Sequence, residues 1–295
     1  MRIGQPDALD EETAHELRTL AGEVEALDGS PPLSDQALVQ LTVGGTPVRH
    51  VVADDESGPT GYAQATLGAD AASVEVLVGP VPDRPGLADA LVETVAAALP
   101  ARRILAWAHG ATSPVRAALE RHGFAPVRSL LRMQRSIDDV TVDPPPEHIR
   151  LRTFEVGKDE AAWLAVNARA FADHPEQGGW TTADLLARER EDWFDPAGFF
   201  LAEDASGALL GYHWTKLHPG RSSVGEVYVL GVDPAAQRHH LGGALLSAGL
   251  AWLRAQGAHT AMLYSDDSNL TAVRLYEKRG FRTVEIDTQY ELRAT

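Results

Sequence analysis

The sequence predicts a two-domain protein of the mixed α/β (α+β) class in which one fold occurs twice. The chain has 295 residues, about twice the length of a usual domain. A proline-rich break near the middle, with matching elements on either side of it, indicates a repeat. Each half is predicted to carry helices, then a strand meander, then a strand–helix–strand–helix–strand unit.

The break is the segment 136–148, SIDDVTVDPPPEH. Its three consecutive prolines begin at Pro144 and fit neither a helix interior nor a central strand, so a stiff linker is expected. We therefore expect an N-terminal domain over residues 1–140, a linker over 141–148 and a C-terminal domain over 149–295.

In the first half, apolar periodicity predicts two early helices and then the strand–helix–strand–helix unit. The expected order is helices 11–27 and 35–41, strand 73–78 (SVEVLV), a proline-rich turn, a helix from about Leu87, strand 104–108, and a helix ending in the motif ALERHGF at 118–124.

The second half shows the same order. The expected elements are helices 159–172 and 181–193, a hairpin of strands 199–203 and 209–216 around Ser206-Gly207, strand 225–232, a helix from about Leu241, strand 260–264, and a helix ending in LYEKRGF at 275–281.

Two landmarks give nearly the same spacing between the halves. Pro80 and Pro234 follow equivalent strands and lie 154 residues apart, whereas Gly123 and Gly280 end equivalent helices and lie 157 residues apart. Separate elements that agree in order and in spacing indicate a duplicated domain.

Composition excludes several classes of function. A net charge of −16 argues against a nucleic-acid partner, because polyphosphate binding needs clustered Lys and Arg. The chain has no cysteine, which excludes disulfides, cysteine nucleophiles and thiolate metal sites, and its histidines lack metal-ligand spacing, so no metal is expected. No apolar run is long enough to span a membrane and no signal peptide is recognisable, so a cytoplasmic protein is expected.

The turn after strand 225–232 carries the first chemical signal. It runs Gln237-Arg238-His239-His240-Leu241-Gly242-Gly243 and opens a helix. Glycines there let backbone N–H groups approach a pyrophosphate, and the helix directs its positive end at the same charge. Such a turn alone is also common as a plain structural joint. The full order of strand, turn, helix, strand, Asn269-started helix and Gly-Phe resembles the GNAT acetyltransferase family, whose turn has glycine where this chain has His240.

The GNAT resemblance implies a fold and a general acid. Each half would be a GNAT domain, a mixed and mostly antiparallel sheet flanked by helices. A tyrosine at the place of Tyr276 would lie near the sulfur of CoA and protonate the leaving thiolate. The competing interpretation of Tyr276 is an ordinary tyrosine of an amphipathic helix.

Glu226 lies on the strand that enters the turn, where a carboxylate can take a proton from an attacking ammonium. An α-amino group with a pKa of about 8 needs only modest help near neutral pH. Backbone N–H groups of residues 229–232 would polarise the thioester carbonyl. The competing interpretation of Glu226 is a solvent-facing strand residue.

The repeat supplies an internal comparison. Aligning Pro234 with Pro80 places Ala72 opposite Glu226, and aligning Gly280 with Gly123 places Leu119 opposite Tyr276. The turn of the first half begins with Asp83, an acid that would repel phosphate. Catalysis is therefore expected only in the second half.

Within the GNAT enzymes the whole chain resembles the tandem-domain mycothiol synthase family. The tandem layout, the stretch HPEQGGWT at residues 174–181, Trp214-Thr215-Lys216 and residues 225–229 carry this resemblance. It implies Glu226 as base and Tyr276 as acid. The implied substrate contacts are Asp35, Glu176, Lys216, Glu226 and Tyr264, with Asp35 standing where the family usually has a glutamate. Glu176 and Lys216 are otherwise readable as an exposed loop acid and a solvated strand lysine.

The same resemblance implies where acetyl-CoA would bind. The implied contacts in the second half are Leu230, Gly231, Val232, Gln237, Arg238, His239, His240, Leu241, Gly242, Gly243, Asn269, Leu270, Thr271, Ala272, Val273 and Arg274, and those of a second CoA in the first half are Val76, Leu77 and Val78.

The expected function is transfer of acetyl from acetyl-CoA to the cysteine amine of cysteinyl-glucosaminyl-inositol, by a monomer, without a covalent acyl-enzyme. One alternative is another GNAT N-acetyltransferase that acts on a protein N-terminus or an aminoglycoside. The other is a non-catalytic acyl-CoA sensor, which would bind CoA without turnover.

Overall fold

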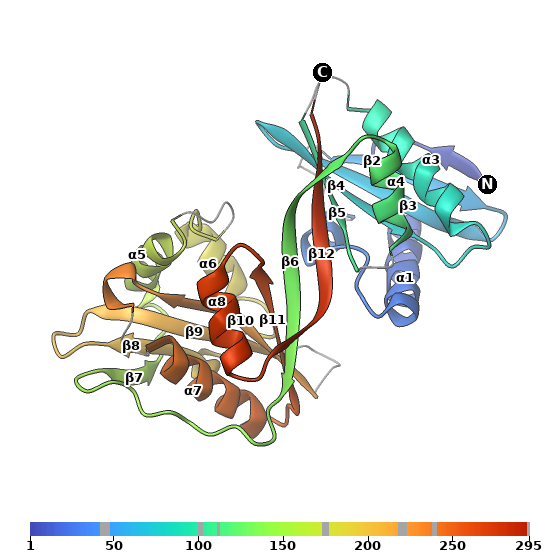
Figure 1. Cartoon of the computed structure of the whole chain (residues 1–295). Coiled ribbons are helices and arrows are strands. Elements are labelled where there is room, and N and C mark those ends of the chain that lie inside the picture. The colour runs from blue at the N-terminus through green and yellow to red at the C-terminus, as the bar shows by residue number, and fades with distance from the viewer. Residues whose placement is uncertain are drawn as a thin grey trace. The chain divides into compact units, whose positions relative to one another are not determined.

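The structure is a computed structural model of the chain (Figure 1). It describes residues 1–41, 48–99, 103–110, 113–172, 177–217, 223–237 and 241–293, with the backbone alone for Asp35. Two compact units divide it. Unit 1 is Met1–Leu131, Asp266–Ser268 and Glu285–Thr295, and unit 2 is Arg132–Ser265 and Asn269–Val284.

These units divide the chain at other residues than the expected domains 1–140 and 149–295. The cause is the last strand of each half, β6 (Ala125–Ser136) and β12 (Arg282–Leu292), because each contributes residues to both units. The expected linker, residues 141–148, forms neither helix nor strand and belongs to unit 2, where the Asp143 N–H donates to Ser247 Oγ at 2.9 Å.

Unit 1 contains the elements of the first half. In chain order they are β1 (Arg2–Gly4), α1 (Glu11–Asp28), α2 (Asp35–Gln40), β2 (Val48–Asp55), β3 (Gly58–Leu67), β4 (Ala71–Val78), α3 (Arg84–Ala97), β5 (Arg103–Ala108), α4 (Pro114–Arg121) and the first part of β6. The sheet order is β1-β2-β3-β4-β5-β12, antiparallel except for the parallel pair β4–β5.

Strand β12 departs from a simple repeat, because it comes from the second half of the chain but lies in the sheet of the first. Residues from Thr288 to Leu292 pair antiparallel with β5, so the end of the second half completes the sheet of the first. A row of side-chain bonds holds it there: Arg103 binds Glu291 at 2.7 Å, Arg116 donates to Thr288 at 2.9 Å, and Tyr290 donates to Glu120 at 2.9 Å.

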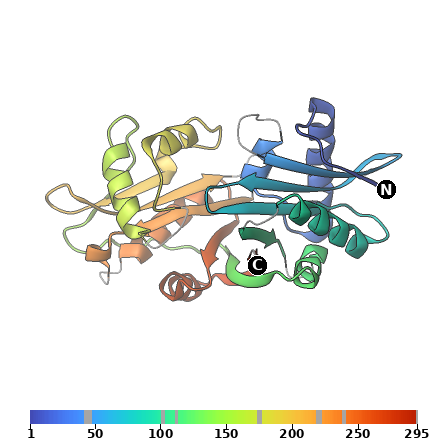
Figure 2. The same cartoon turned by 90° about the horizontal axis from the view of Figure 1, so that it is seen from above.

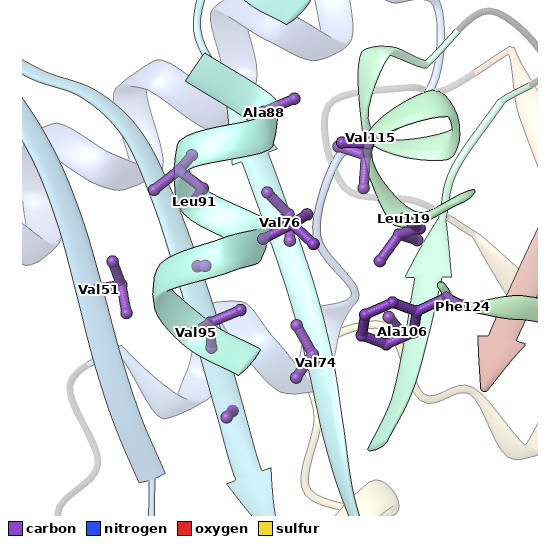
Figure 3. Packing of buried hydrophobic residues seen from close by; sticks show 14 of the residues in the cluster. Val51, Val74, Val76, Ala88, Leu91, Val95, Ala106, Val115, Leu119 and Phe124 are labelled. Atoms are coloured by element: carbon purple, nitrogen blue, oxygen red, sulfur yellow. The ribbon is translucent and has the colours of Figure 1, made fainter. Parts of the chain in front are cut away.

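The core of unit 1 has two layers. Figure 3 shows the layer under α3 and α4, where apolar side chains of these helices meet those of the strands. Leu119 and Phe124 lie in this layer. On the opposite face of the sheet, α1 and α2 cover a second cluster that includes Tyr62 and Leu77. Burying one such side chain stabilises the fold by about 1.5–3 kcal/mol.

Unit 2 contains the elements of the second half. They are β7 (Arg150–Thr153), α5 (Glu160–Ala170), α6 (Thr182–Arg188), η1 (Pro196–Gly198), β8 (Phe199–Glu203), β9 (Leu209–Leu217), β10 (Val224–Val232), η2 (Pro234–Ala236), α7 (Leu241–Ala255), β11 (Thr260–Asp266), α8 (Leu270–Lys278) and the first residues of β12. The sheet order is β11-β10-β9-β8-β7, with β10–β11 parallel and the other pairs antiparallel.

Helices cover both faces of this sheet. Figure 2 shows α5 and α6 on one side of the strands and α7 on the other. An aromatic cluster fills the α5/α6 side, centred on Trp163 and Trp214, both fully buried. The α7 side carries smaller apolar residues such as Leu241 and Leu245.

The expected elements are confirmed with shifts at their ends. The expected hairpin is β8 and β9, and Gly207 takes the left-handed conformation of its turn (φ 84°). Helix α3 begins at Arg84 rather than near Leu87, because Asp83 caps it and Pro85 is accepted in its first turn. Helix α6 ends at Arg188, short of the expected 193. The mixed, mostly antiparallel fold class is confirmed.

Among the described residues, no helix is both long and apolar enough to cross a bilayer. Within the same residues, His, Asp and Glu side chains form no group of three or more able to hold a metal ion.

Candidate active site

Strand β10 changes its register at one residue. It pairs antiparallel with β9 as Val227↔Thr215 and then Val229↔Trp214, so Tyr228 is an extra residue that forms a β-bulge. A bulge bends the strand and increases its local twist, and bulges occur often beside active sites.

The neighbouring pair of strands separates at the same place. Strands β10 and β11 pair in parallel from Val224↔Thr260 to Glu226↔Met262, and the pairing ends there although β10 continues to Val232 and β11 to Asp266. On this side of β10, the backbone beyond Glu226 is therefore not bonded to β11. An extended amide chain can use such a strand edge by adding to it like a further strand.

The sheet face on which Glu226 lies follows from its neighbours. A Cβ on Gly225 would lie 2.6 Å from Leu253 of α7, so Gly225 faces α7 and Glu226 faces the α5/α6 side. Lys216 is the direct cross-strand partner of Glu226, and both side chains are 8% exposed. Opposed residues of an antiparallel pair share a face, which brings this carboxylate and this ammonium together.

Lys216 is held among aromatic rings. Its Nζ lies 4.9 Å from the ring centre of Trp193 and 5.6 Å from that of Tyr228, within the range of cation–π attraction. The Arg188 Nε donates to the Tyr228 hydroxyl at 3.0 Å, and the Arg188 guanidinium lies 4.0 Å from the ring centre of Trp180. We call Trp180, Trp193 and Tyr228 the aromatic wall.

The aromatic wall lies on the same face as Glu226. Burial raises the pKa of Tyr228, and the nearby cations Arg188 and Lys216 oppose that shift only in part. Tyr228 therefore stays a neutral phenol at neutral pH, able both to accept from Arg188 and to donate to a ligand.

Tyr264 belongs to this face as well. It lies two residues beyond Met262 on β11, and Met262 is the register partner of Glu226. Because side chains of a strand alternate between faces, Tyr264 projects to the side of Glu226 and Lys216, and it is 37% exposed.

Tyr276 approaches from the other face. It lies on α8, which packs against the start of α7 where a Cβ on Gly242 would lie 3.4 Å from Leu275. Its side chain is 7% exposed, and its ring meets Phe281 edge-on with 5.8 Å between centres. Burial raises its pKa, so the phenol keeps its proton throughout the neutral range, as a general acid requires.

The start of α7 suits a phosphate. Its first turn has no acidic residue, and the first N–H groups of a helix have no partner within the helix. Gly243 also has a packing role. A Cβ there would lie 2.3 Å from Nη2 of Arg279, the residue that caps the C-terminal end of α8. Asn269 caps α8 by accepting from the Ala272 N–H at 3.1 Å.

The comparisons with known proteins agree with this geometry. Residues 163–281 match the family model described as "Acetyltransferase (GNAT) family". The chain is 45% identical to a mycothiol acetyltransferase of Thermomonospora curvata, with 97% of this chain and 95% of the relative covered. Relatives of the same name from Salinispora tropica (43% identical, 99% and 97% covered) and Arthrobacter sp. strain FB24 (41%, 96% and 93%) match equally broadly. The chain belongs to the mycothiol acetyltransferase family.

Solved structures agree with the tandem GNAT fold. A GCN5-related N-acetyltransferase from Sphaerobacter thermophilus superimposes with a TM-score of 0.76 at 22% identity, covering 98% of this chain and 95% of that one. A tandem GNAT protein from the clavulanic acid biosynthesis pathway gives 0.73 at 17% identity, covering 100% and 98%. The tandem GNAT architecture expected from the repeat is confirmed.

The predicted site residues of this mycothiol acetyltransferase family member are the catalytic and substrate residues, the CoA residues, and those that the structure does not describe. Glu226, Lys216 and Tyr264 share one face of unit 2, and Tyr276 lies on a helix of the opposite face. The predicted CoA residues 230–232, 241–243 and 269–274 lie at the end of β10, the start of α7 and the start of α8, and Gln237 follows η2. Arg238, His239, His240 and Glu176 lie outside the described residues, as does the side chain of Asp35, whose backbone begins α2 of unit 1.

Four residues of this face were not predicted from the sequence: Arg188 and the three members of the aromatic wall. Trp180 stands inside the stretch HPEQGGWT, and Tyr228 inside the strand GEVYVLGV, so both lie within motifs that predict the site. Arg188 and Trp193 had no recognisable signal, because only the tertiary fold brings α6 and the segment after it over β10.

One expected alignment between the halves is wrong by one residue. Ala72 was placed opposite Glu226, but the bulge at Tyr228 has no counterpart in β4, which pairs with β3 without a register shift. Ser73 pairs in parallel with Leu105 as Glu226 does with Met262, and Leu105 and Met262 have the same 157-residue spacing as Gly123 and Gly280. Ser73 is therefore the counterpart of Glu226, and it too lacks a carboxylate.

The other alignment is confirmed. The Phe124 N–H donates to the Leu119 carbonyl at 3.0 Å, and the Phe281 N–H donates to the Tyr276 carbonyl at 3.0 Å. Leu119 is completely buried in the core of unit 1, so an apolar packing residue occupies the place of the phenol (Figure 3).

Proposed function

We propose that this chain N-acetylates the cysteine amine of cysteinyl-glucosaminyl-inositol with acetyl-CoA as donor, yielding mycothiol. The observation that carries the proposal is the position of Glu226 and Tyr276. They lie on opposite faces of one sheet, and strands β10 and β11 part directly beyond Glu226, which opens a place where groups from both faces can reach a common ligand. The name shared by relatives that cover nearly the whole chain supports the substrate.

Acetyl-CoA supplies the acetyl group and a thiolate as leaving group. The backbone of β10 beyond the bulge, residues 229–232, offers N–H groups to the thioester carbonyl and orients it. The first turn of α7 offers further N–H groups and the positive helix end to the pyrophosphate.

The proton transfers use the two groups on either side of the opening. An α-amino group with an ordinary pKa of about 8 is already partly neutral near pH 7, so the neutral amine attacks the thioester carbonyl, and Glu226 accepts the proton that the nitrogen loses as the amide forms. Tyr276 donates its proton to the departing thiolate, and its raised pKa keeps that proton available. Direct transfer between two bound substrates needs no covalent intermediate on the protein.

The same face would hold the amino-sugar substrate. Lys216 and Tyr264 offer a cation and a hydroxyl beside Glu226, and the aromatic wall offers flat apolar surface to a sugar ring. Glu176 and Asp35 remain proposed contacts on the strength of the family resemblance.

The test measures the N-acetylated product by mass spectrometry for cysteinyl-glucosaminyl-inositol, an aminoglycoside and a peptide N-terminus, each with acetyl-CoA. We expect kcat/KM for the first to exceed that for the others by at least about 100-fold, which corresponds to about 2.7 kcal/mol. Preference for another amine would indicate a different GNAT acetyltransferase. CoA binding without any product would indicate a sensor, and either result would refute the proposal.

A matched pair of variants tests the base. Glu226→Gln should lower kcat by about 10²- to 10⁴-fold, the usual contribution of a general base. Glu203→Gln is the control, because Glu203 is also a partly buried strand carboxylate of unit 2, paired with Arg152 at 2.6 Å, but lies on β8. If both variants lose the same activity, Glu226 is not the base.

A further inference from the structure

The turn between β4 and α3 of unit 1 is the counterpart of the proposed phosphate-binding turn of unit 2. The family resemblance implies a second CoA in this half, in contact with Val76, Leu77 and Val78. The side chains and backbone of this turn can be compared directly with what such a ligand would require, because residues 71–97 are all described.

The start of α3 already holds an anion. Asp83 caps the helix, and its Oδ1 accepts from the Gly86 N–H at 2.9 Å. The Asp83 carboxylate atoms lie between 2.3 and 3.1 Å from where a Cβ on Gly86 would stand, so the carboxylate covers the side of the glycine that a phosphate would approach. The Gly86 N–H and the positive helix end therefore serve a carboxylate of the chain itself.

The cation of the turn is also engaged within the protein. Arg84 donates to both carboxylate oxygens of Asp28 at the end of α1, at 2.9 and 2.5 Å. The same guanidinium donates to the Val78 carbonyl at 3.1 Å. This contact occupies the backbone acceptor of Val78, one of the three residues that the resemblance places in contact with CoA.

Strand β4 lacks the deformation found in β10. Its register with β3 runs without a shift from Ala72 to Val78, and the Gly79 N–H continues it by donating to the Thr60 carbonyl at 2.9 Å. The side chains of Val76 and Val78 belong to one core layer and that of Leu77 to the other. Strands β4 and β5 also stop pairing, after Val74↔Ala106, so the misfit lies in the turn. There the Asp83 carboxylate holds the Gly86 N–H and the Arg84 guanidinium holds the Val78 carbonyl, and the residues of unit 1 therefore do not fit the CoA that the resemblance implies.

We infer that acetyl-CoA binds at one site per chain, at the α7 turn. In the equivalent turn of unit 1, the side chains of Asp83 and Arg84 occupy the groups that CoA would need and prevent it from binding. The α7 part of this inference rests on the proposed function. The unit 1 part rests only on the contacts above. A phosphate entering the α3 turn would have to displace the Asp83 carboxylate while being repelled by it.

The first measurement is isothermal titration calorimetry of the full chain with acetyl-CoA, without the amine substrate. We expect a stoichiometry of one. In the variant Gly242→Asp, which places a carboxylate in the first turn of α7, we expect binding to weaken at least 100-fold, with circular dichroism and thermal melting used to check folding. A stoichiometry of two in the unchanged protein, or one undiminished site remaining in a folded Gly242→Asp variant, would overturn the inference.

The second measurement locates the ligand without any substitution. Hydrogen–deuterium exchange with saturating acetyl-CoA should slow the amides of residues 241–246 at least several-fold and leave those of residues 84–90 unchanged. Slowed exchange over 84–90 would mean that unit 1 binds CoA. Slowed exchange at neither segment would refute the α7 site as well. Both outcomes are independent of which amine is acetylated, so a failure of the proposed substrate would not be confused with a failure of this inference.

Discussion

Replacing Tyr276 with phenylalanine removes the proposed acid and little else. The ring packs edge-on against Phe281 and the side chain is almost wholly buried, so phenylalanine keeps these contacts. The fold of α8 should be unaffected, since its cap is Asn269. Only the hydroxyl disappears, which makes the variant a direct probe of proton donation.

The expected size of the effect follows from the acidity of the group. General acids contribute about 10²- to 10⁴-fold, most when their pKa lies near the working pH. Burial raises the pKa of Tyr276 above its ordinary value near 10, and a thiol has a pKa of about 8.5, so transfer to the thiolate is uphill in the resting site. We therefore expect the lower part of the range, a fall in kcat of about 10²- to 10³-fold, or about 3–4 kcal/mol of transition-state stabilisation.

The assay is steady-state kinetics with both substrates varied. The KM for acetyl-CoA should stay within about threefold, because the proposed acetyl-CoA contacts come from α7 and β10. In the unchanged enzyme, the raised pKa of Tyr276 also predicts how kcat depends on pH. The phenol remains protonated up to a pH above 10, so kcat should show no loss between pH 8 and 10 from this group.

Tyr290→Phe is the matched control. It removes a hydroxyl that donates to Glu120 at 2.9 Å in unit 1, and it should leave kcat within about twofold. A Tyr276→Phe variant with more than a tenth of the normal kcat, or a loss no greater than that of Tyr290→Phe, would show that another group protonates the thiolate.

Further predictions concern neighbouring groups. Lys216→Met should raise the KM for the amine substrate by about 10- to 100-fold and leave the KM for acetyl-CoA unchanged, because the ammonium lies beside Glu226 on the substrate face; equal changes in both KM values would contradict this. Arg188→Met and Tyr228→Phe should lower kcat/KM for the amine non-additively in a double-mutant cycle, because the two side chains share one hydrogen bond; strict additivity would deny the coupling. Burial lowers the pKa of His213 to about 4, so the folded state binds this proton less well than the unfolded state. As the pH falls from about 6.5 to 4, this group should lower the free energy of unfolding by roughly 3 kcal/mol. Chemical denaturation of the protein and of His213→Asn across this range checks the prediction: the free energy of unfolding should depend less steeply on pH in the variant.

Much of the fold was predictable from local patterns. Apolar spacing located the helices around Leu91 and Leu245, and the turn residues Ser206 and Gly207 located the hairpin of unit 2. The repeat predicted that Leu119 stands where Tyr276 does. These features depend on residues near one another in the chain, and periodicity and turn chemistry report them directly.

The grouping of Glu226, Lys216 and Tyr264 was predictable, but the residues around them were not. Glu226, Lys216 and Tyr264 were expected near the substrate, and the sheet register places them on one face. Arg188 and Trp193 reach that face only because α6 and the following segment fold over β10, a long-range contact that no local pattern indicates.

The amino-acid order by itself indicated a duplicated domain in which only the second copy carries Glu226 and Tyr276, the proposed base and acid. Tertiary structure alone decided that Tyr228 is an extra residue, that Ser73 rather than Ala72 stands opposite Glu226, that the end of β12 completes the sheet of unit 1, and that Asp83 covers Gly86. The physical reason is that register and strand pairing are relations between two segments of backbone, set by how their hydrogen bonds and side chains fit together, and each segment is compatible with several such pairings until the other is in place.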